Sequence, residues 1–383
     1  MRADVSGFAR EAVLALGPTG PFSPRPESRG LVNLRFNENV YGGPHLRYPD
    51  DSPDELVSCY AAALDAVDPP PTRPRTVWDE RNLLLTRGAV DALELVLRAF
   101  FEPGADAVAL TPPTFGFFER LAALHGVARH PVPLLGPAFQ RLDLERLLAL
   151  PVKGVLLCDP GNPTGAPLHP ADVETLLERF PGLVVIDETY AELAGRPSHR
   201  HRVADHPNLV VLRSMSKGFA LAGLRLGAVL GQPPLVAAVR LVRQPFALPG
   251  PVVERARAEL SDHAALRRRI ERFTAERARL AAGLGDCPGM GRVHAGAGFV
   301  TAEPGDLAGA RERLLRAGFA AVSEPDAMTG FLRISVGTPE QNDRLVAALG
   351  GRPAAAPPAA SAAVSPAVSP AVSPVLTATP VRM

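Results

Sequence analysis

Cysteine, charge of one sign and long hydrophobic runs are all scarce in this 383-residue sequence. The cysteines Cys59, Cys158 and Cys287 lie far apart and form no CxxC pair, which excludes a disulfide framework and a zinc site. The 41 Lys and Arg residues balance the 40 Asp and Glu residues, so no basic field is present to hold a nucleic acid. No stretch approaches the roughly 18 apolar residues that cross a membrane, and the N-terminal apolar run is too short for a signal peptide. We therefore expect a cytoplasmic protein without a metal and without a nucleic-acid or membrane partner.

Lysine is the scarcest charged residue, because only Lys153 and Lys217 are found among the 41 basic residues. A lysine that such a chain retains becomes a candidate for amine chemistry. The length allows two or three domains at roughly 150 residues each. A hydrophobic content of 46% is sufficient for a real core.

Composition divides the chain into four segments. Residues 1–30 form an N-terminal arm, 31–235 a large domain and 236–352 a smaller C-terminal domain. The last segment, 353–383, repeats AVSP and contains one charged residue. Frequent proline and small side chains cannot bury enough area to offset the entropy of ordering, so this tail is predicted to be disordered.

Apolar strands alternate with amphipathic helices through the large domain, which predicts an α/β fold with a mostly parallel sheet covered by helices. After residue 231, long helices and short strands predict a smaller α+β domain. In parallel sheets, ligands bind at the carboxyl ends of the strands. The expected strands are 82–86, 107–110, 155–158, 184–187, 209–212, 298–301 and 331–335. The expected helices are 90–101, 117–125, 170–179, 307–317 and 339–349, together with long helices that span roughly 236–284.

The segment SMSKGFALAGLRLG places Lys217 directly after the strand 209–212. A lysine amine can form a Schiff base with an aldehyde cofactor, and the hydroxyls of Ser214 and Ser216 with Arg225 could hold a phosphate. An isolated SxSK would favour a surface lysine in a loop, but here the full spacing S-x-S-K-x7-R-x-G is present.

Three more loops follow predicted strands. Asp187 ends the strand VVID and could hold a pyridine nitrogen protonated, with Tyr190 three residues on; a plain helix N-cap is the alternative. A ribose-binding acid would need a GxGxxG, which the sequence lacks. The turn DPGNPTG presents the amide of Asn162. Gly88 opens a helix whose free N–H groups would attract a phosphate.

The chain resembles a fold-type-I, class I/II aminotransferase dependent on pyridoxal phosphate (PLP), and most of all the histidinol-phosphate aminotransferase branch. The resemblance runs from about residue 31 to residue 349. It rests on the stretches NENVYGGP, LRYPD, TRGAVDAL, TPPTFGFF, DPGNPTG, VIDETYAEL, LRSMSKGFALAGLRLG and FLRISVGTPEQN.

The resemblance implies roles for the residues that meet the cofactor ring. Lys217 would form the Schiff base with PLP and then move the substrate's Cα proton. Asp187 would pair with the pyridine nitrogen, while Asn162 and Tyr190 would hydrogen-bond the ring oxygen. Phe115, in PPTF, would stack on the ring.

The resemblance also implies residues for the phosphate and the substrate. Arg333, in FLRIS, would bind the carboxylate of the amino donor or acceptor; a solvated strand arginine is the alternative. Asn39, in NEN, would lie near the substrate, and Tyr48, in RYPD, would reach the cofactor of a neighbouring subunit. The cofactor phosphate would be held by Ser214, Ser216, Arg225, Gly88, Ala89 and Val90.

Several positions depart from the family pattern. Phe115 replaces a tyrosine, Val90 an acidic residue and Val40 a proline. Phe22, expected at the substrate, replaces a tyrosine, and the stretch 321–325 lacks an arginine that these enzymes usually carry. The cofactor site is therefore expected to be intact, and the grip on a substrate phosphate is expected to be weaker.

The favoured hypothesis is a homodimeric PLP-dependent aminotransferase with shared active sites, which takes a small amino donor and 2-oxoglutarate. Histidinol phosphate is the nearest family donor, and an aromatic amino acid is the runner-up. A threonine-phosphate decarboxylase-like enzyme shares this scaffold and an FLRIS-like ending. A non-catalytic PLP-binding protein, such as the sensor half of a transcription factor, would need a fused DNA-binding domain.

Overall fold

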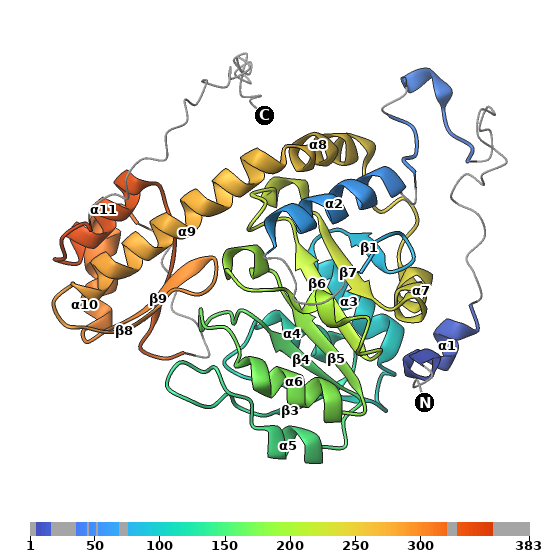
Figure 1. The fold of residues 1–383 in the computed structure, drawn as a ribbon, viewed down its shortest axis with the longest axis horizontal. Coiled ribbons are helices and arrows are strands. Elements are labelled where there is room, and N and C mark those ends of the chain that lie inside the picture. Colours follow the sequence, from blue (N-terminus) through green and yellow to red (C-terminus); the bar gives the residue numbers. More distant parts are fainter. Residues whose placement is uncertain are drawn as a thin grey trace, which may run out of the picture.

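The computed structural model describes residues 5–16, 36–43, 46–50, 53–68, 76–319 and 328–354. Within them the chain forms a large sheet flanked by helices and a smaller sheet with helices of its own (Figure 1). None of the helices in these segments combines the length and the apolar character needed to cross a membrane.

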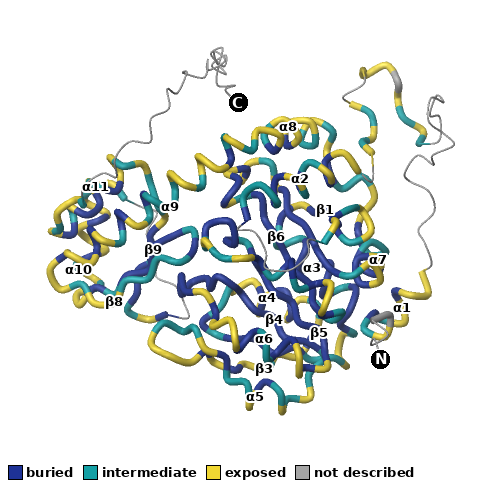
Figure 2. Tube along the Cα trace, in the orientation of Figure 1, coloured by how far each residue is buried: buried dark blue, intermediate teal, exposed yellow. Residues whose placement is uncertain are grey.

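In the described residues the large sheet has seven strands in the order β1-β7-β6-β5-β4-β2-β3. The strands β6, β5, β4, β2 and β3 run parallel, and β7 is antiparallel to both β6 and β1. Several strands are continuous apolar runs because both faces of the sheet are covered, and Figure 2 shows β4, β5 and β6 buried. The bounds are β1 Leu83–Thr86, β2 Ala107–Leu110, β3 Ala128–Pro131, β4 Gly154–Cys158, β5 Leu183–Asp187, β6 Leu209–Ser214 and β7 Gly227–Gly231.

Helices cover the two faces of this sheet and form two separate apolar clusters with it. Successive strand residues point to opposite faces, so Leu83 and Leu85 belong to one cluster and Leu84 to the other. The first face is covered by α2 (Asp54–Val67), α5 (Leu144–Ala149), α6 (Pro170–Arg179) and α8 (Gly250–Ser261), and the second by α3 (Ala89–Phe100), α4 (Phe117–Leu124) and α7 (Pro233–Val242).

The long helix α9 (His263–Gly285) connects the two parts of the molecule: it packs against α2 and then against the small sheet (Figure 1). That sheet has the antiparallel order β10-β9-β8. Its own core includes Leu280, Val300, Leu314 and Ile334. The bounds are β8 Met290–His294, β9 Phe299–Pro304, β10 Leu332–Ser335, α10 Leu307–Arg316 and α11 Pro339–Ala348.

Short helices complete the described chain. The helix α1 (Glu11–Leu14) belongs to the N-terminal arm, which Arg10 ties to α3 by donating to the carbonyl of Arg98 (3.0 Å) and to Glu102 (2.9 Å). The 3₁₀ helices are η1 Val5–Phe8, η3 Val40–Gly42, η5 Ala191–Leu193, η6 His199–Arg202 and η7 Ala222–Leu224.

The predicted fold class is confirmed, and each predicted strand has a counterpart. Sequence reasoning missed α1, α2, β3, α5, β7 and β8. β3 is an edge strand of largely exposed residues, so it lacks an apolar run, and β7 follows the Lys217 motif too closely to stand out. The long helices predicted over 236–284 are α7, α8 and α9, which the segments around Gln244 and Asp262 separate. The domain limits at residues 30, 235 and 352 stay predictions, and the tail from 355 onward lies outside the described residues.

Candidate active site

Four strands bring their carboxyl ends to one edge of the large sheet. Cys158 pairs with Asp187 at the ends of β4 and β5. The antiparallel strand β7 begins at the same edge, where Gly227 pairs with both Thr86 of β1 and Ser214 of β6. The loops that follow these strands are therefore neighbours, as the sequence predicted.

The loops after β1 and β6 form a cradle for an anion. Gly88 precedes α3 with φ +94° and gives no side-chain cap, so the first N–H groups of the helix remain available. A Cβ on Gly88 would lie 3.0 Å from Nη2 of Arg225, so that guanidinium borders the helix start. The Nη1 of Arg225 donates to the Ser216 hydroxyl (3.4 Å), whose own N–H donates to the Ser214 hydroxyl (3.2 Å).

Gly227 keeps this cradle compact. A Cβ there would lie 2.5 Å from the carbonyl carbon of Gly88 and 2.7 Å from the nitrogen of Ala89. Val90 lies half-buried in the first turn of α3. The fold thus brings together the residues predicted for the phosphate. Gly227 lies beside them and must be a glycine because there is no room for a Cβ, a reason that the sequence motif alone did not explain.

Asp187 is a buried carboxyl with no cation beside it among the described residues. Its Oδ1 accepts from the N–H (2.9 Å) and the hydroxyl (2.6 Å) of Thr189. Burial outweighs these bonds and raises the pKa of Asp187 to about 6. A ligand that brings a protonated nitrogen to this carboxyl would lower its pKa again. Sequence reasoning missed Thr189, although a D-x-T turn at a strand end was the available signal.

Lys217 lies over the ring of Tyr190, with Nζ 5.9 Å from the ring centroid. Burial lowers the pKa of Lys217, and the positive charges of Arg333 and Arg225 lower it further. A larger fraction of the amine is therefore neutral and nucleophilic near neutral pH. In the described residues no hydrogen bond engages this amine. Burial also raises the pKa of the Tyr190 hydroxyl, which therefore stays protonated.

The small sheet supplies the other side of the site. Arg333 of β10 donates from Nη1 to Oδ1 of Asn162 (2.6 Å) and lies over the ring of Phe299, 5.5 Å from its centroid. Phe299 meets Tyr190 edge to face at 5.5 Å. Gly298 makes room for this contact, because a Cβ there would lie 2.7 Å from the Tyr190 ring. Phe299 and Gly298 were not predicted, since GAGF carries no chemical signature.

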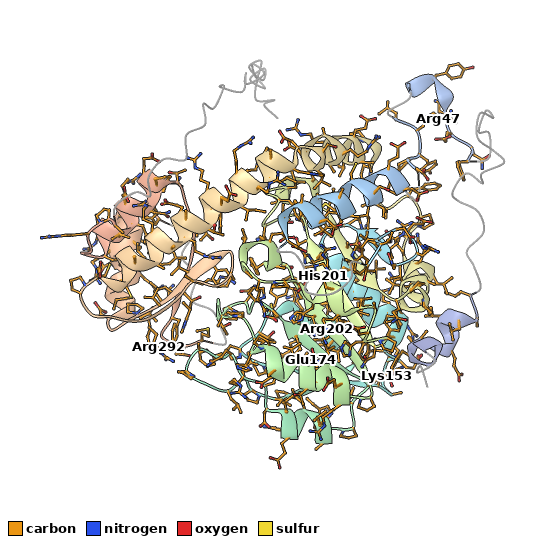
Figure 3. The ribbon with its side chains drawn as sticks, in the orientation of Figure 1. Arg47, Lys153, Glu174, His201, Arg202 and Arg292 are labelled. Atoms are coloured by element: carbon orange, nitrogen blue, oxygen red, sulfur yellow. The ribbon has the colours of Figure 1, made fainter. Side chains whose placement is uncertain are left out.

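Three other predicted residues have neighbours of their own. Phe115 follows β2 and stacks on Phe117 (5.4 Å, 24°). Asn39 caps η3 through the N–H of Tyr41, and half-exposed Tyr48 stacks on Phe246 at 4.6 Å. Figure 3 shows Arg47 of the same segment at the outer edge of the molecule, far from Arg292 of the small sheet. The roles of Asn39, Tyr48 and Phe115 stay predictions, and Phe22 and 321–325 lie outside the described residues.

The geometry suits PLP on three counts. Among the described residues, the buried carboxyl of Asp187 has no cation beside it, and a helix start and a guanidinium form an anion cradle. The amine of Lys217, whose pKa is lowered, lies over an aromatic ring. The site therefore matches an aldehyde cofactor with a basic ring nitrogen and a phosphate.

Comparison with known proteins agrees with this assignment. The pattern of the family "Aminotransferase class I and II" matches residues 42–349, and the chain belongs to that family of PLP-dependent enzymes. More particularly, it is similar to the histidinol-phosphate aminotransferases of Stenotrophomonas maltophilia (38% identity, 86% of this chain and 92% of that one) and Xylella fastidiosa strain 9a5c (37%, 84% and 89%). It also resembles the structure of histidinol-phosphate aminotransferase from Sinorhizobium meliloti in complex with pyridoxal-5'-phosphate (TM-score 0.65, 27% identity, 77% and 80% coverage).

Replacement of Asp187 by asparagine should separate stability from activity. At pH 8 the folded wild-type apoprotein carries an ionised, buried carboxyl, so D187N should raise the free energy of unfolding by up to about 3 kcal/mol. The gain should fade as the pH falls through about 6 toward 4, because the wild-type carboxyl then binds its proton in the folded state. Turnover with cofactor should fall about a hundredfold or more, or ~2.7 kcal/mol. Chemical denaturation at several pH values and steady-state kinetics measure both; wild-type turnover would contradict the role.

Replacement of Gly227 by alanine should damage the phosphate cradle. The new methyl group would push against the backbone of Gly88 and Ala89, so we expect cofactor affinity to fall about tenfold or more, at a cost of ~1.4 kcal/mol. Gly223→Ala is the matched control, because a Cβ at Gly223 meets nothing within 4 Å. Absorbance titration of the apoprotein with PLP measures both variants, and equal affinities would refute the packing argument.

Proposed function

We propose that this enzyme transfers the amino group of histidinol phosphate to 2-oxoglutarate, with the cofactor held covalently by Lys217. The donor is supported by the names of the relatives at 38% and 37% identity, which cover most of this chain. The covalent link is supported above all by one observation, the amine of Lys217 over Tyr190 with a lowered pKa.

When bound, PLP supplies an electron sink for the charge that develops at the donor's Cα. Asp187 would hold the ring nitrogen protonated. Asn162 and Tyr190 would orient the ring through its oxygen; Nδ2 of Asn162 has no bond within the described residues and can donate. Once released, the amine of Lys217 would take the proton from the donor's Cα as a general base and deliver it to C4′ of the cofactor as a general acid.

Arg333 would select anionic substrates. Its guanidinium can donate hydrogen bonds to the phosphate of histidinol phosphate in one half-reaction and to a carboxylate of 2-oxoglutarate in the other, because both groups fit its bidentate geometry. Its bond to Asn162 places this recognition beside the cofactor ring. One arginine on the small sheet would therefore serve both substrates in turn.

Covalent attachment at Lys217 is directly testable. Borohydride reduction of the yellow holoenzyme should bleach the cofactor band, and peptide mapping should find the label on Lys217. Lys217→Ala should lose essentially all turnover while still binding PLP noncovalently. Lys153→Arg is the control, because Lys153 forms an ion pair with Asp106 (2.7 Å) and should not react. A label on Lys153 would overturn the assignment.

Donor preference follows from the departures at Phe22 and 321–325, which lie outside the described residues. Loss of a charge-assisted bond costs ~1.5–3 kcal/mol, so histidinol phosphate should be used about ten- to a hundredfold less efficiently than by an enzyme with the full pattern. An aromatic donor, phenylalanine or tyrosine, should come within about tenfold in kcat/KM. Parallel assays with 2-oxoglutarate measure this ratio. Efficient use of histidinol phosphate, with no activity on phenylalanine or tyrosine, would contradict this prediction and would show that other arginines bind the substrate phosphate.

We also propose a homodimer with shared active sites. The segment 36–50 carries Tyr41 and Leu46, which are 94% and 79% exposed, and Figure 1 shows it at the periphery of the chain. Tyr48 on the same segment would reach the partner's cofactor phosphate. A cytoplasmic location is proposed as well, supported by three cysteines without disulfides.

Mixing two inactive variants tests the dimer. A Tyr48→Ala chain and a Lys217→Ala chain, unfolded and refolded together, should recover up to about a quarter of wild-type activity, because the random hybrid contains one intact site. Each variant refolded alone is the control. Activity from a strict monomer in sedimentation would contradict shared sites.

A further inference from the structure

A buried ion network lies next to Lys217 and is not used by the proposed chemistry. At its centre is Arg213 of β6, which is fully buried. Its guanidinium donates to acceptors from three separate segments, which are Glu188 (2.9 Å) and Glu192 (2.7 Å) after β5, Ser198 (2.8 Å) before η6 and Asp68 (3.2 Å) at the end of α2.

The bond between Arg213 and Glu192 joins two segments that carry site residues. Arg213 precedes Lys217 by four residues, and Glu192 follows Tyr190 by two. The ion pair between Arg213 and Glu192 therefore joins the segment that carries Lys217 to the segment that carries Tyr190, and it needs no cofactor.

Glu192 also touches the Lys217 turn directly. A Cβ on Gly218 would lie 2.5 Å from Cβ and 2.8 Å from Oε2 of Glu192. Gly218 is not among the glycines with positive φ, so the reason for a glycine here is that the side chain of Glu192 leaves no room for a Cβ. The side chain of Glu192 therefore packs directly against the backbone of Gly218, the residue that follows Lys217.

The contact does not depend on a full charge at Glu192. Burial raises the pKa of Glu192 to about 7 despite the nearby Arg213, and Oε2 has no hydrogen-bond partner in the described residues. Glutamine has the same shape and keeps an oxygen for Arg213. Alanine at position 192 removes both the packing contact with Gly218 and the hydrogen bond from Arg213.

We propose that Glu192, held by Arg213, is a positioning residue for Lys217: its side chain supports the backbone at Gly218 and so sets where the amine lies above Tyr190. The proposal rests on the proposed function of Lys217, but it concerns a geometry that the apoprotein already has.

The test uses the reactivity of Lys217 in the full-length apoprotein. In a Lys153→Arg background Lys217 is the only lysine, and peptide mass spectrometry follows its acylation by acetic anhydride from pH 6 to 10. Glu192→Ala should shift the pH midpoint of Lys217 upward, toward that of an ordinary lysine, because a loosened amine gains water. Glu192→Gln should keep the wild-type midpoint. In the PLP-loaded enzyme Glu192→Ala should lower kcat by up to about a hundredfold with little change in KM.

Glu276→Ala is the matched control, because Glu276 is also buried and paired with an arginine, Arg279 (2.9 Å), but lies on α9. It should lower the melting temperature without moving the Lys217 midpoint. If Glu192→Ala does not fold, Gly218→Ala tests the same contact from the other side and should shift the midpoint in the same direction.

Two results would overturn the positioning role. One is a wild-type midpoint and kcat in Glu192→Ala or Gly218→Ala. The other is a Glu192→Gln variant as impaired as Glu192→Ala, which would assign the effect to charge. A wild-type enzyme inactive on every donor would instead overturn the proposed function, while the acylation midpoint would still decide the role of Glu192.

Discussion

The buried guanidinium of Arg213 is the interaction on which much of the site depends. A charge removed from water costs several kcal/mol unless it is paired. Both terminal nitrogens of Arg213 donate to carboxylates or a hydroxyl, while its Nε has no partner among the described residues. Burial would raise the pKa of Asp68, but Arg213 and Arg200 outweigh it and keep that carboxyl ionised. The strand that leads to Lys217, the loop after Asp187 and the end of α2 must therefore fold together.

The electrostatics of the open site are the reverse of this closed network. Asp187 is buried with no cation beside it, while Arg225 and the start of α3 face each other with no anion between them in the described chain. A cofactor with a protonated ring nitrogen at one end and a phosphate at the other would place a positive charge beside Asp187 and a negative charge beside Arg225. Binding of PLP would therefore be favoured at both ends of the site, at the carboxyl of Asp187 and at the cradle formed by Arg225 and the start of α3.

The small sheet completes the site by a few polar contacts. Arg333 reaches Asn162, and the hydroxyl of Thr301 donates to the carbonyl of Pro163 (2.8 Å), so the turn DPGNPTG is held from the small sheet as well as from β4. At the start of the same turn, buried Asp159 accepts from the Leu168 N–H (2.9 Å) and pairs with His199 (2.7 Å). The substrate recognition proposed for Arg333 and the cofactor orientation proposed for Asn162 would therefore be coupled through this contact.

The sequence by itself determined the alternation of strands and helices, the family and the loops that carry Lys217, Asp187 and Gly88, because these are local patterns of hydrophobicity, turn residues and spacing. The edge strand β3 had no such pattern, and neither did β7, which lies between β1 and β6, since their pairing depends on residues far away in the chain. Only the tertiary structure decided that Arg333 meets Asn162 and that Glu192 packs on Gly218. These contacts join segments separated by tens to hundreds of residues, and their distances follow from the packing of whole elements rather than from any local preference of the chain.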